Sequence, residues 1–374
     1  MVKRGVASLA ILGSYPPPYG GVAIHVQRLC PLLEARGISY VAYNATSDVG
    51  DGDRVIGVYS RRRTWLLRYL FTAKEPVIYM MSGRLVAWVI GALMASLRGK
   101  RVILRLGNAS LPDWIAQSWW RRFWVRFSVR RMETVICVSE YLVEAVRSAG
   151  ADPKKLLWVP GFLPPTVDSA DRDEVSPEVW KFAEKHGPLI AANGKVDWYD
   201  GQDLYGLDLL VELTARLKDD YPNIGVVICF WDHRPNDSDH LDSLLREASD
   251  RGIHDNILFN TKSGLFVPVM AASDVFVRPT NTDGDANSVR EGLYLGIPTV
   301  ASDAAERPPG TILFRNRDMD DFEAKVRAAL QSNGKTGERR SPLADPKDLQ
   351  RIEAYLDRLA ALTGRCTEQA VGAR

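Results

Sequence analysis

The chain has 374 residues, of which 46% are hydrophobic and 25% are charged, as in ordinary soluble globular proteins. This length favours two domains, or at most three. The formal net charge of +2 gives no global electrostatic basis for binding nucleic acid, so a nucleic-acid-binding protein is not expected.

Cysteine usage and apolar runs indicate the compartment. The four cysteines form no CxxC pair, and three lie in apolar runs, at Cys30, Cys137 and Cys229. This usage fits a reducing cytoplasm better than a disulfide framework or a zinc site. The apolar run 6–12 leads directly into a glycine loop, so we expect a first strand rather than a signal peptide. The longest apolar stretch, 85–97, is too short to span a bilayer.

The first half of the chain predicts a parallel α/β sheet. A buried strand at 6–12 is followed by a glycine loop, a helix at 22–36 and a strand at 38–43, the order that opens such a sheet. The same alternation continues through further expected strands and helices: strands 77–81, 101–106, 134–138 and 156–159, and helices 84–97, 114–132 and 140–148.

The second half repeats this alternation after a polar, acidic stretch at 164–174 that has no apolar period. We expect the following elements there: a helix at 177–186, strands 189–192, 224–230, 256–259, 275–277, 299–302 and 312–314, and helices 207–218, 239–251, 267–272, 320–331 and 349–362.

The predicted fold class is therefore α/β, with two Rossmann-like parallel-sheet domains. The expected divisions are an N-terminal domain at 1–163, a connection at 164–187, a second domain at 188–345, a C-terminal helix at 346–362 that can return to the first domain, and a disordered tail at 363–374. Ligands of such sheets bind at the carboxyl ends of the strands, so we expect the two domains to face each other across a ligand-binding cleft.

One stretch, 283–303, combines features that suit a sugar nucleotide. Its pattern predicts a loop, a helix of about two turns beginning near Asn287 or Ser288, a glycine–proline stop and a buried strand. The free amides and positive dipole end of such a helix suit an anion. Asp283 before the helix and Glu291 in its expected first turn can accept hydrogen bonds from hydroxyls. A ligand with a diphosphate and sugar hydroxyls would use both.

The same residues can also be explained by a structural role instead of ligand binding. Ser288 and Glu291 have the spacing of a capping box, in which each side chain binds the other residue's backbone N–H. From the pattern alone, this structural role is favoured over ligand binding, although the two roles are compatible.

These motifs resemble those of the retaining group 1 (family 4) glycosyltransferases of the GT-B fold. That family has two glutamates separated by seven residues and then a GxPVVAS segment; here Asp283 and Glu291 have this separation, and GIPTVAS follows at 296–302. In the first half, YGGV at 19–22 resembles the family's glycine loop, and VICVS at 135–139 resembles its strand ending in serine. The resemblance extends from residue 6 to about residue 331.

The resemblance implies roles for individual residues. Glu291 would accept hydrogen bonds from the donor ribose, and Asp283, where the family usually has Glu, would face the transferred sugar, so these two form the expected catalytic pair. Further donor contacts are implied for the glycine loop, the basic residue after the first strand of the second half, the border of the base pocket and the start of the short helix: Gly20, Gly21, Lys195, Asn260, Lys262, Gly284, Asp285, Ala286, Asn287 and Ser288.

No cofactor is expected, because the nucleotide sugar is a substrate. No metal is expected either. Asp283 and Asp285 have the spacing of a metal clamp, but the family uses this loop for sugar hydroxyls. Preorganised amides, a lysine and a helix N-terminus can stabilise the leaving diphosphate without a metal.

The sequence also departs from the family's pattern. A basic residue usually precedes Gly206, but Tyr205 stands there; Arg278 or Arg290 could supply the missing charge. The family often has His-Gly after the strand at 101–106, where this chain has Leu106, Gly107 and Asn108. Asn108 or His25 could cover part of that histidine's work, although a lone histidine on a helix is as readily a packed side chain.

The stretch from Trp114 to Arg131 interleaves tryptophans with arginines, and 61–68 adds a second basic aromatic patch. We interpret them as a candidate contact with an anionic membrane surface. The alternative is an ordinary helix with one packed face and one solvated basic stripe. Members of the resembled family often use lipid-carrier acceptors, and this favours the membrane.

The expected function is that of a metal-independent retaining glycosyltransferase. It would move a hexose from a UDP- or GDP-linked sugar to a glycan or lipid-linked acceptor, in the cytoplasm or peripherally on the inner membrane face. One alternative is a sugar-nucleotide epimerase of related fold, which would need acid–base groups around the sugar C2. A second is a non-catalytic sugar-nucleotide-binding protein, which the missing basic residue and histidine suggest.

Overall fold

The protein is described from a computed structural model that covers residues 6–17, 19–107, 118–165, 169–230, 237–262, 264–283, 286–334 and 345–371. It divides into two compact units. Unit 1 comprises residues 1–163 together with 346–374, and unit 2 comprises residues 164–345. Each unit has its own parallel sheet, so the predicted class of two parallel-sheet α/β domains is confirmed.

Unit 1 contains a seven-stranded parallel sheet in the order β3-β2-β1-β4-β5-β6-β7. Its strands are β1 (Leu9–Gly13), β2 (Tyr40–Asn44), β3 (Val55–Gly57), β4 (Val77–Met81), β5 (Arg101–Leu106), β6 (Thr134–Cys137) and β7 (Leu156–Trp158). The strand order reverses between β1 and β4, so the loops that follow these two strands flank a topological switch point.

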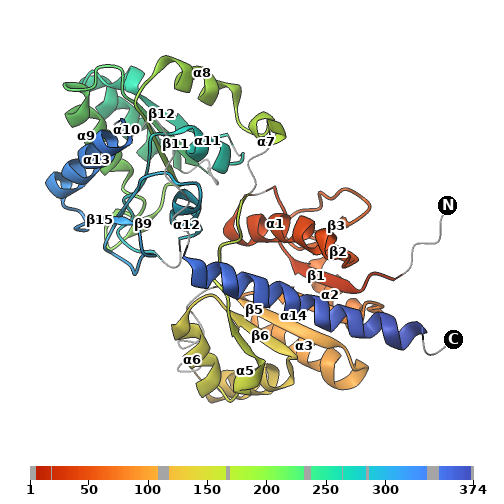
Figure 1. The fold of residues 1–374 in the computed structure, drawn as a ribbon. Coiled ribbons are helices and arrows are strands. Elements are labelled where there is room, and N and C mark those ends of the chain that lie inside the picture. Colours follow the sequence, from red (N-terminus) through yellow and green to blue (C-terminus); the bar gives the residue numbers. More distant parts are fainter. Residues whose placement is uncertain are drawn as a thin grey trace. The chain divides into compact units, whose positions relative to one another are not determined.

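Helices cover both faces of this sheet (Figure 1). They are α1 (Gly21–Ala35), α2 (Arg62–Thr72), α3 (Leu85–Arg98), α5 (Trp119–Arg131), α6 (Glu140–Ser148), the 3-10 helix Pro153–Lys155 and α14 (Pro346–Val371). One core joins the sheet to α2, α3, α5 and α6. On the other face α14 lies beside α1, where Arg36 pairs with Glu353.

The C-terminal helix α14 packs on unit 1. The Tyr355 hydroxyl donates to the Tyr79 hydroxyl of β4 at 3.0 Å, and the Arg351 guanidinium lies 3.4 Å from the ring centroid of Trp158. The disorder predicted from Thr363 onward is wrong for residues 363–371, which continue α14. The buried Thr363 hydroxyl donates to the backbone oxygen of Leu359, one turn earlier in the same helix.

Unit 2 contains a six-stranded parallel sheet in the order β12-β11-β8-β13-β14-β15 and a separate two-stranded hairpin. Its strands are β8 (Leu189–Gly194), β9 (Trp198–Tyr199), β10 (Gln202–Asp203), β11 (Gly225–Phe230), β12 (Ile257–Asn260), β13 (Val275–Arg278), β14 (Thr299–Ser302) and β15 (Ile312–Phe314). Its helices are α7 (Ser169–Asp173), α8 (Pro177–Lys185), α9 (Leu207–Lys218), α10 (Ser238–Asp250), the 3-10 helix His254–Asn256, α11 (Val267–Ala272), α12 (Asn287–Tyr294) and α13 (Met319–Gly334).

The segment predicted as an interdomain connection, 164–187, belongs to unit 2. Val179 of α8 is fully buried and packs with β8 and β11, so this helix covers the sheet rather than linking two bodies. Strand β3, helix α2 and the β9–β10 hairpin are not among the expected elements. No helix among the described residues is both long and apolar enough to cross a membrane.

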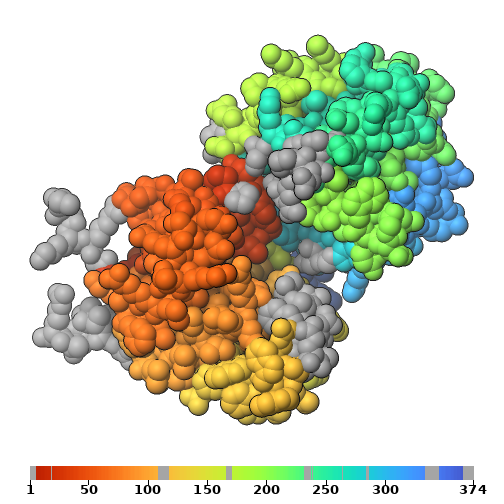
Figure 2. Space-filling view, turned by 180° about the vertical axis from the view of Figure 1, so that it is seen from behind, coloured from red at the N-terminus to blue at the C-terminus, as the bar shows by residue number. Residues whose placement is uncertain are grey.

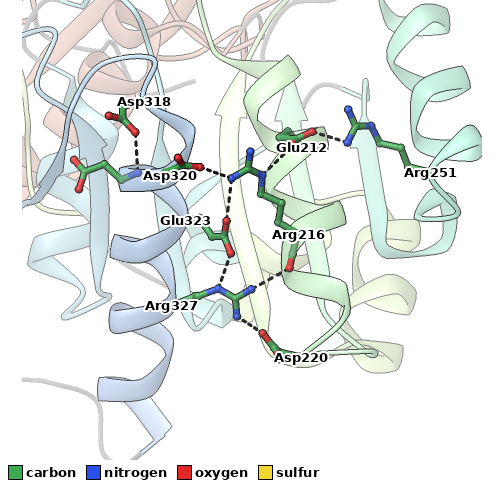
Figure 3. Close-up of polar contacts among 9 residues, drawn as sticks. Glu212, Arg216, Asp220, Arg251, Asp318, Asp320, Glu323 and Arg327 are labelled. Atoms are coloured by element: carbon green, nitrogen blue, oxygen red, sulfur yellow. Dashed lines mark hydrogen bonds and ion pairs between the residues drawn. The ribbon is translucent and has the colours of Figure 1, made fainter.

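A network of ion pairs joins α9 to α10 and α13 (Figure 3). Arg216 donates to Glu212 at 2.7 Å and to Asp320 at 2.6 Å, and it also pairs with Glu323. Glu323 pairs in turn with Arg327 at 2.8 Å. Because each arginine is shared by carboxylates from two helices, the network fixes the helix layer on this face of unit 2.

Replacing Arg216 with glutamine should lower the free energy of unfolding by about 1 kcal/mol, because one partially exposed cation serves three carboxylates. Salt screens such pairs, so the loss should shrink in high salt. Urea unfolding at low and high NaCl measures it, with Arg246→Gln on the exposed side of α10 as the matched control. An equal loss at both salt concentrations would contradict an electrostatic role.

Candidate functional site

The sheet of unit 2 also has a topological switch point, between β8 and β13. The chain runs from β8 outward to β11 and β12, then returns to β13 and continues outward through β14 to β15. Loops at the carboxyl ends of the two central strands diverge at such a point and leave room for a ligand. Lys195 follows β8 directly, and residues 279–286 follow β13 and lead into α12.

Arg278, the last residue of β13, ties these two loops together. Its Nη1 atom donates to the backbone oxygen and to Oδ1 of Asn193 on β8, both at 3.1 Å. Its Nε atom donates to Asp283 Oδ2 at 3.0 Å. The side chain is only 8% exposed, so this cation serves to hold the ends of β8 and β13 together.

Asp283 is held by a second buried cation, Arg307, whose side chain is 1% exposed. Arg307 Nη1 donates to Asp283 Oδ2 at 3.1 Å, and Nη2 donates to the Thr280 hydroxyl at 3.0 Å. Its Nε donates to the backbone oxygen of Ser302 on β14 at 3.1 Å. The Thr280 hydroxyl also donates to Asp283 Oδ2, so three donors converge on this one oxygen.

These contacts set the charge of Asp283. Burial by itself would raise the pKa of this carboxyl, but the Arg278 and Arg307 guanidinium groups outweigh burial, and the pKa lies below its ordinary value. Asp283 is therefore an ionised carboxylate whose position is fixed by Arg278, Thr280 and Arg307.

The N-terminus of α9 approaches the same loop. Gly206, its N-cap, has φ +64°, and a Cβ atom there would come within 2.4 Å of the Pro279 backbone oxygen. Only glycine suits both the left-handed backbone and this close approach. Tyr205 precedes it, and the Arg278 guanidinium lies 5.1 Å from the Tyr205 ring centroid. Burial raises the pKa of Tyr205 to about 12, so its hydroxyl is neutral.

Arg278 thus reaches the position where Tyr205 departs from the family pattern. Arg278 and Arg290 are the two residues predicted as possible sources of the missing charge. The guanidinium of Arg278 lies over Tyr205, whereas Arg290 belongs to α12. The cation lies beside Tyr205 but is already bonded to Asp283 and Asn193.

Helix α12 begins at Asn287, as predicted, but the capping box does not form. The N-cap is Ala286, which makes no side-chain capping bond, and Ser288 is the second helical residue. Glu291 therefore lies in the second turn, not the first, and is 6% exposed. Ser288 and Glu291 have the three-residue separation of the motif, but the helix starts two residues too early for Ser288 to be its N-cap. Among the described residues, the buried Asn287 Oδ1 atom has no hydrogen-bond donor.

Lys195 and the base-border residues lie in the loops expected of them, with partners of their own. The Lys195 ammonium pairs with Asp197 at 2.7 Å. Asn260, at the end of β12, is buried, and its amide donates to the Lys262 backbone oxygen at 3.4 Å. The Lys262 ammonium is exposed and pairs with Glu178 of α8 at 3.3 Å.

The remaining predicted residues lie in unit 1 or outside the described residues. Gly20 caps α1 and Gly21 begins it, at the switch point of the unit 1 sheet. His25 is 3% exposed, and its Nδ1 atom lies 3.2 Å from the Gly161 carbonyl oxygen. Burial and the nearby Arg105 lower its pKa well below the ordinary value, so His25 is a neutral packed residue. Asn108, Gly284 and Asp285 fall outside the described residues.

Two features of this region were not predicted: Arg307, which no motif marks, and an Asp–His pair beside the Lys195 loop. His240 Nε2 lies 2.9 Å from Asp203 Oδ2, and the Trp198 ring packs on the imidazole with centroids 4.8 Å apart. The hairpin that carries Trp198 and Asp203 turns at Asp200 and Gly201, which have φ of 51° and 73°. An Asp-Gly pair with two positive φ values is the usual two-residue hairpin turn, so this element could have been predicted.

Among the described residues, no three His, Cys, Asp or Glu side chains gather as ligands for a metal ion. The expected metal independence stays a prediction.

Comparisons with known proteins place the fold. No family model matches the chain, and no curated protein matches it in sequence. Solved structures do resemble it. A UDP-forming α,α-trehalose-phosphate synthase from Burkholderia xenovorans has a TM-score of 0.66 at 15% identity, covering 96% of this chain and 99% of that one. HepE of Anabaena in complex with UDP-glucose has a TM-score of 0.64 at 14% identity, covering 96% of this chain and 99% of that one.

A third structure, sucrose-phosphate synthase from Thermosynechococcus elongatus, has a TM-score of 0.59 at 16% identity, covering 98% of this chain and 99% of that one. At such identities the likeness concerns the fold alone. It covers nearly the whole length of each protein, so both units have the architecture of the GT-B class, as predicted.

Proposed function

We propose that this protein is a glycosyltransferase that takes a hexose from a nucleotide-diphosphate sugar, bound at the switch point of unit 2. The observation that carries the proposal is the convergence of the α12 and α9 N-termini, the Lys195 loop and Arg278 on one edge of the sheet. Backbone amides and cations gathered at a switch point suit a diphosphate. The likeness to HepE with UDP-glucose supports a UDP-linked donor, with a GDP-linked one as the other choice.

The chemistry needs stabilisation of the leaving group above all. When the bond between the sugar C1 and the phosphate oxygen breaks, negative charge develops on the departing diphosphate. Fixed N–H dipoles at the α12 N-terminus and the Lys195 ammonium would stabilise that charge without reorganising. We propose that this set works without a metal and that the reaction retains the configuration at C1, as in the family that the motifs resemble.

Two carboxylates would have different tasks. We propose that Glu291, on the second turn of α12, accepts hydrogen bonds from the donor ribose. Asp283 was expected to face the sugar; because three donors already converge on its Oδ2 atom, we propose that it mainly positions the loop and the Arg278 cation. The orphaned Asn287 Oδ1 atom would accept a hydrogen bond from a sugar hydroxyl.

We propose a glycan or a lipid-linked sugar as the acceptor and the cytoplasm as the compartment, where the enzyme can associate with the inner membrane face. Cys30, Cys137 and Cys229 are free, buried thiols, which fits a reducing environment.

A donor panel tests the activity. Purified protein is incubated with UDP- and GDP-linked hexoses, with and without acceptor lipids and with and without EDTA, and the released nucleotide is measured. The proposal expects release from one donor that an acceptor accelerates and EDTA leaves unchanged. Tight nucleotide binding with no turnover on any acceptor would favour a non-catalytic binding protein. Conversion of the donor into its C2 epimer would favour the epimerase.

Lys195→Ala should raise the donor KM about tenfold or more, since a charged hydrogen bond to phosphate is worth about 1.5–3 kcal/mol. The ammonium must leave Asp197 to bind phosphate, so part of this gain is already offset in the wild type. Initial rates against donor concentration measure the effect. The control is Lys325→Ala on α13, another lysine that pairs with an aspartate, Asp321, at 3.9 Å. Equal KM values for both variants would remove Lys195 from the site.

A further inference from the structure

The charge of the chain is strongly segregated. Residues 54–132 contain sixteen Lys and Arg but only two Asp and Glu, a local net charge of +14 within a chain of net +2. The rest of the chain therefore carries −12. Of the two acidic residues in this stretch, Glu75 is buried and accepts hydrogen bonds from the hydroxyls of Tyr43 and Tyr69. The other, Asp113, lies outside the described residues.

Much of this positive charge lies on three neighbouring helices of unit 1. Helices α2, α3 and α5 contain no Asp or Glu, and α3 packs against both of the others. Arg98 of α3 donates to the Leu70 carbonyl of α2 at 3.0 Å, and Arg131 of α5 donates to the Ser96 hydroxyl of α3 at 3.0 Å. In Figure 2 the orange atoms of α2 and α3 adjoin the yellow atoms of α5.

The outer sides of these helices expose a cluster of large apolar side chains, which is unusual for helices that face water. Trp119 is 83% exposed and Phe71 is 71% exposed. The exposed set comprises Leu67, Phe71, Val86, Leu97, Trp119, Trp120, Phe123 and Trp124. Val125 and Val129, on the opposite side of α5, are fully buried, so α5 has an inner apolar stripe for the core and a second, outer one.

Arginines lie among these apolar groups without neutralising partners. Among the described residues, Arg63, Arg68, Arg122 and Arg126 make no ion pair with a carboxylate. A partner for this face must therefore be anionic and must also accept aromatic and aliphatic side chains. Lipid phosphates above an acyl boundary meet both needs. Single-stranded nucleic acid would stack on the aromatic rings but gives the aliphatic side chains no comparable partner.

We propose that α2, α3 and α5 form the face by which unit 1 docks on an anionic lipid bilayer. The arginines contact lipid phosphates, and Trp119, Trp120, Phe123 and Phe71 enter the headgroup region. The docking itself rests on this surface alone. Its purpose, bringing the enzyme to a lipid-linked acceptor, rests on the proposed function.

Vesicle cosedimentation of the full chain tests the surface, without donor or acceptor. Vesicles of phosphatidylcholine alone are compared with vesicles of equal parts phosphatidylcholine and phosphatidylglycerol, at low and high salt. The proposal expects binding to the anionic vesicles only. Arg122→Glu combined with Arg126→Glu should reduce the partition coefficient by about tenfold or more, since each basic residue near such a surface contributes roughly a fivefold gain. Trp119→Ser combined with Phe123→Ser should cause a loss of about the same size.

The matched control is Leu245→Ser combined with Arg246→Glu, an exposed apolar–arginine pair on α10 of unit 2, which should bind as the wild type does. Circular dichroism verifies that each variant is folded, and nucleotide binding measured on the same samples keeps this test separate from that of the proposed activity. The proposal would be overturned if the wild-type protein did not bind anionic vesicles, or if the α5 variants bound them as the wild type does. Displacement of the protein from the vesicles by a single-stranded oligonucleotide, added at the same total charge as the anionic lipid, would also overturn the proposal and assign the face to nucleic acid.

Discussion

Arg307→Met should lower the free energy of unfolding by about 3 kcal/mol, because removing one partner of a buried ion pair leaves the Asp283 charge with Arg278 as its single remaining cationic partner among the described residues. Arg307 is 1% exposed and Asp283 is 13% exposed, so water cannot replace the lost guanidinium. The Thr280 hydroxyl and the Ser302 backbone oxygen lose their donor in the same step. Urea unfolding measures the loss.

The matched control is Arg315→Met, an exposed arginine of the next loop whose pairs with Asp318 and Asp321 lie in solvent. Its loss should be below about 1 kcal/mol. If both variants lose the same small amount, the buried pair contributes no more than a surface pair, and Asp283 is not the anchor of the loop.

The Asp283 anchor also predicts a pH dependence. Its folded-state pKa is lowered, so its contribution to stability is present above the unfolded value near 3.9 and is lost as the pH falls through the folded value. Wild-type stability should therefore decline below about pH 4. Asp283→Asn should decline less over the same interval, because it has no carboxyl to protonate. Thermal melts from pH 3 to pH 7 make the comparison, and parallel curves would contradict it.

Glu291→Gln should lower kcat/KM for the donor at least about 100-fold, since two hydrogen bonds to a charged carboxylate are worth about 1.5 kcal/mol or more each. The helix should persist, because glutamine keeps the size and shape of the side chain and Glu291 lies beyond the first turn of α12. We therefore expect a melting temperature within about 2 °C of the wild type.

Donor kinetics and thermal melts on the same preparation separate the two roles, with Glu306→Gln at an exposed position as the control. A Glu291 variant that melts much lower but turns over normally would assign the residue to the packing of α12. A variant that keeps both properties would remove Glu291 from the site altogether.

The regular elements of both units were predictable because their strands are buried on both faces and form short continuous apolar runs. The runs at β1, β8 and β11 end at a glycine or a polar loop, and the helices between them have clear stop residues. The start of α12 was predictable from its position after β13 and before a glycine–proline stop. Strand β3 was missed because three residues carry too little pattern.

The interior of the site was not predictable, because its contacts join residues that are far apart in the chain. Arg307 reaches Asp283 across 24 positions, and Arg278 reaches Asn193 across 85. Each lies in a loop or at a strand end, where no periodicity applies. The capping-box prediction failed because a three-residue separation does not by itself decide where a helix begins: the N-cap is Ala286, two residues before Ser288.

The most direct measurement of the central claim is a crystal structure of the full chain with UDP or GDP. The account predicts the diphosphate within hydrogen-bonding distance of the backbone amides at the α12 N-terminus, Lys195 turned from Asp197 toward a phosphate oxygen, and Glu291 facing the ribose. A nucleotide bound only to unit 1, or crystals that bind neither nucleotide at saturating concentration, would contradict the claim.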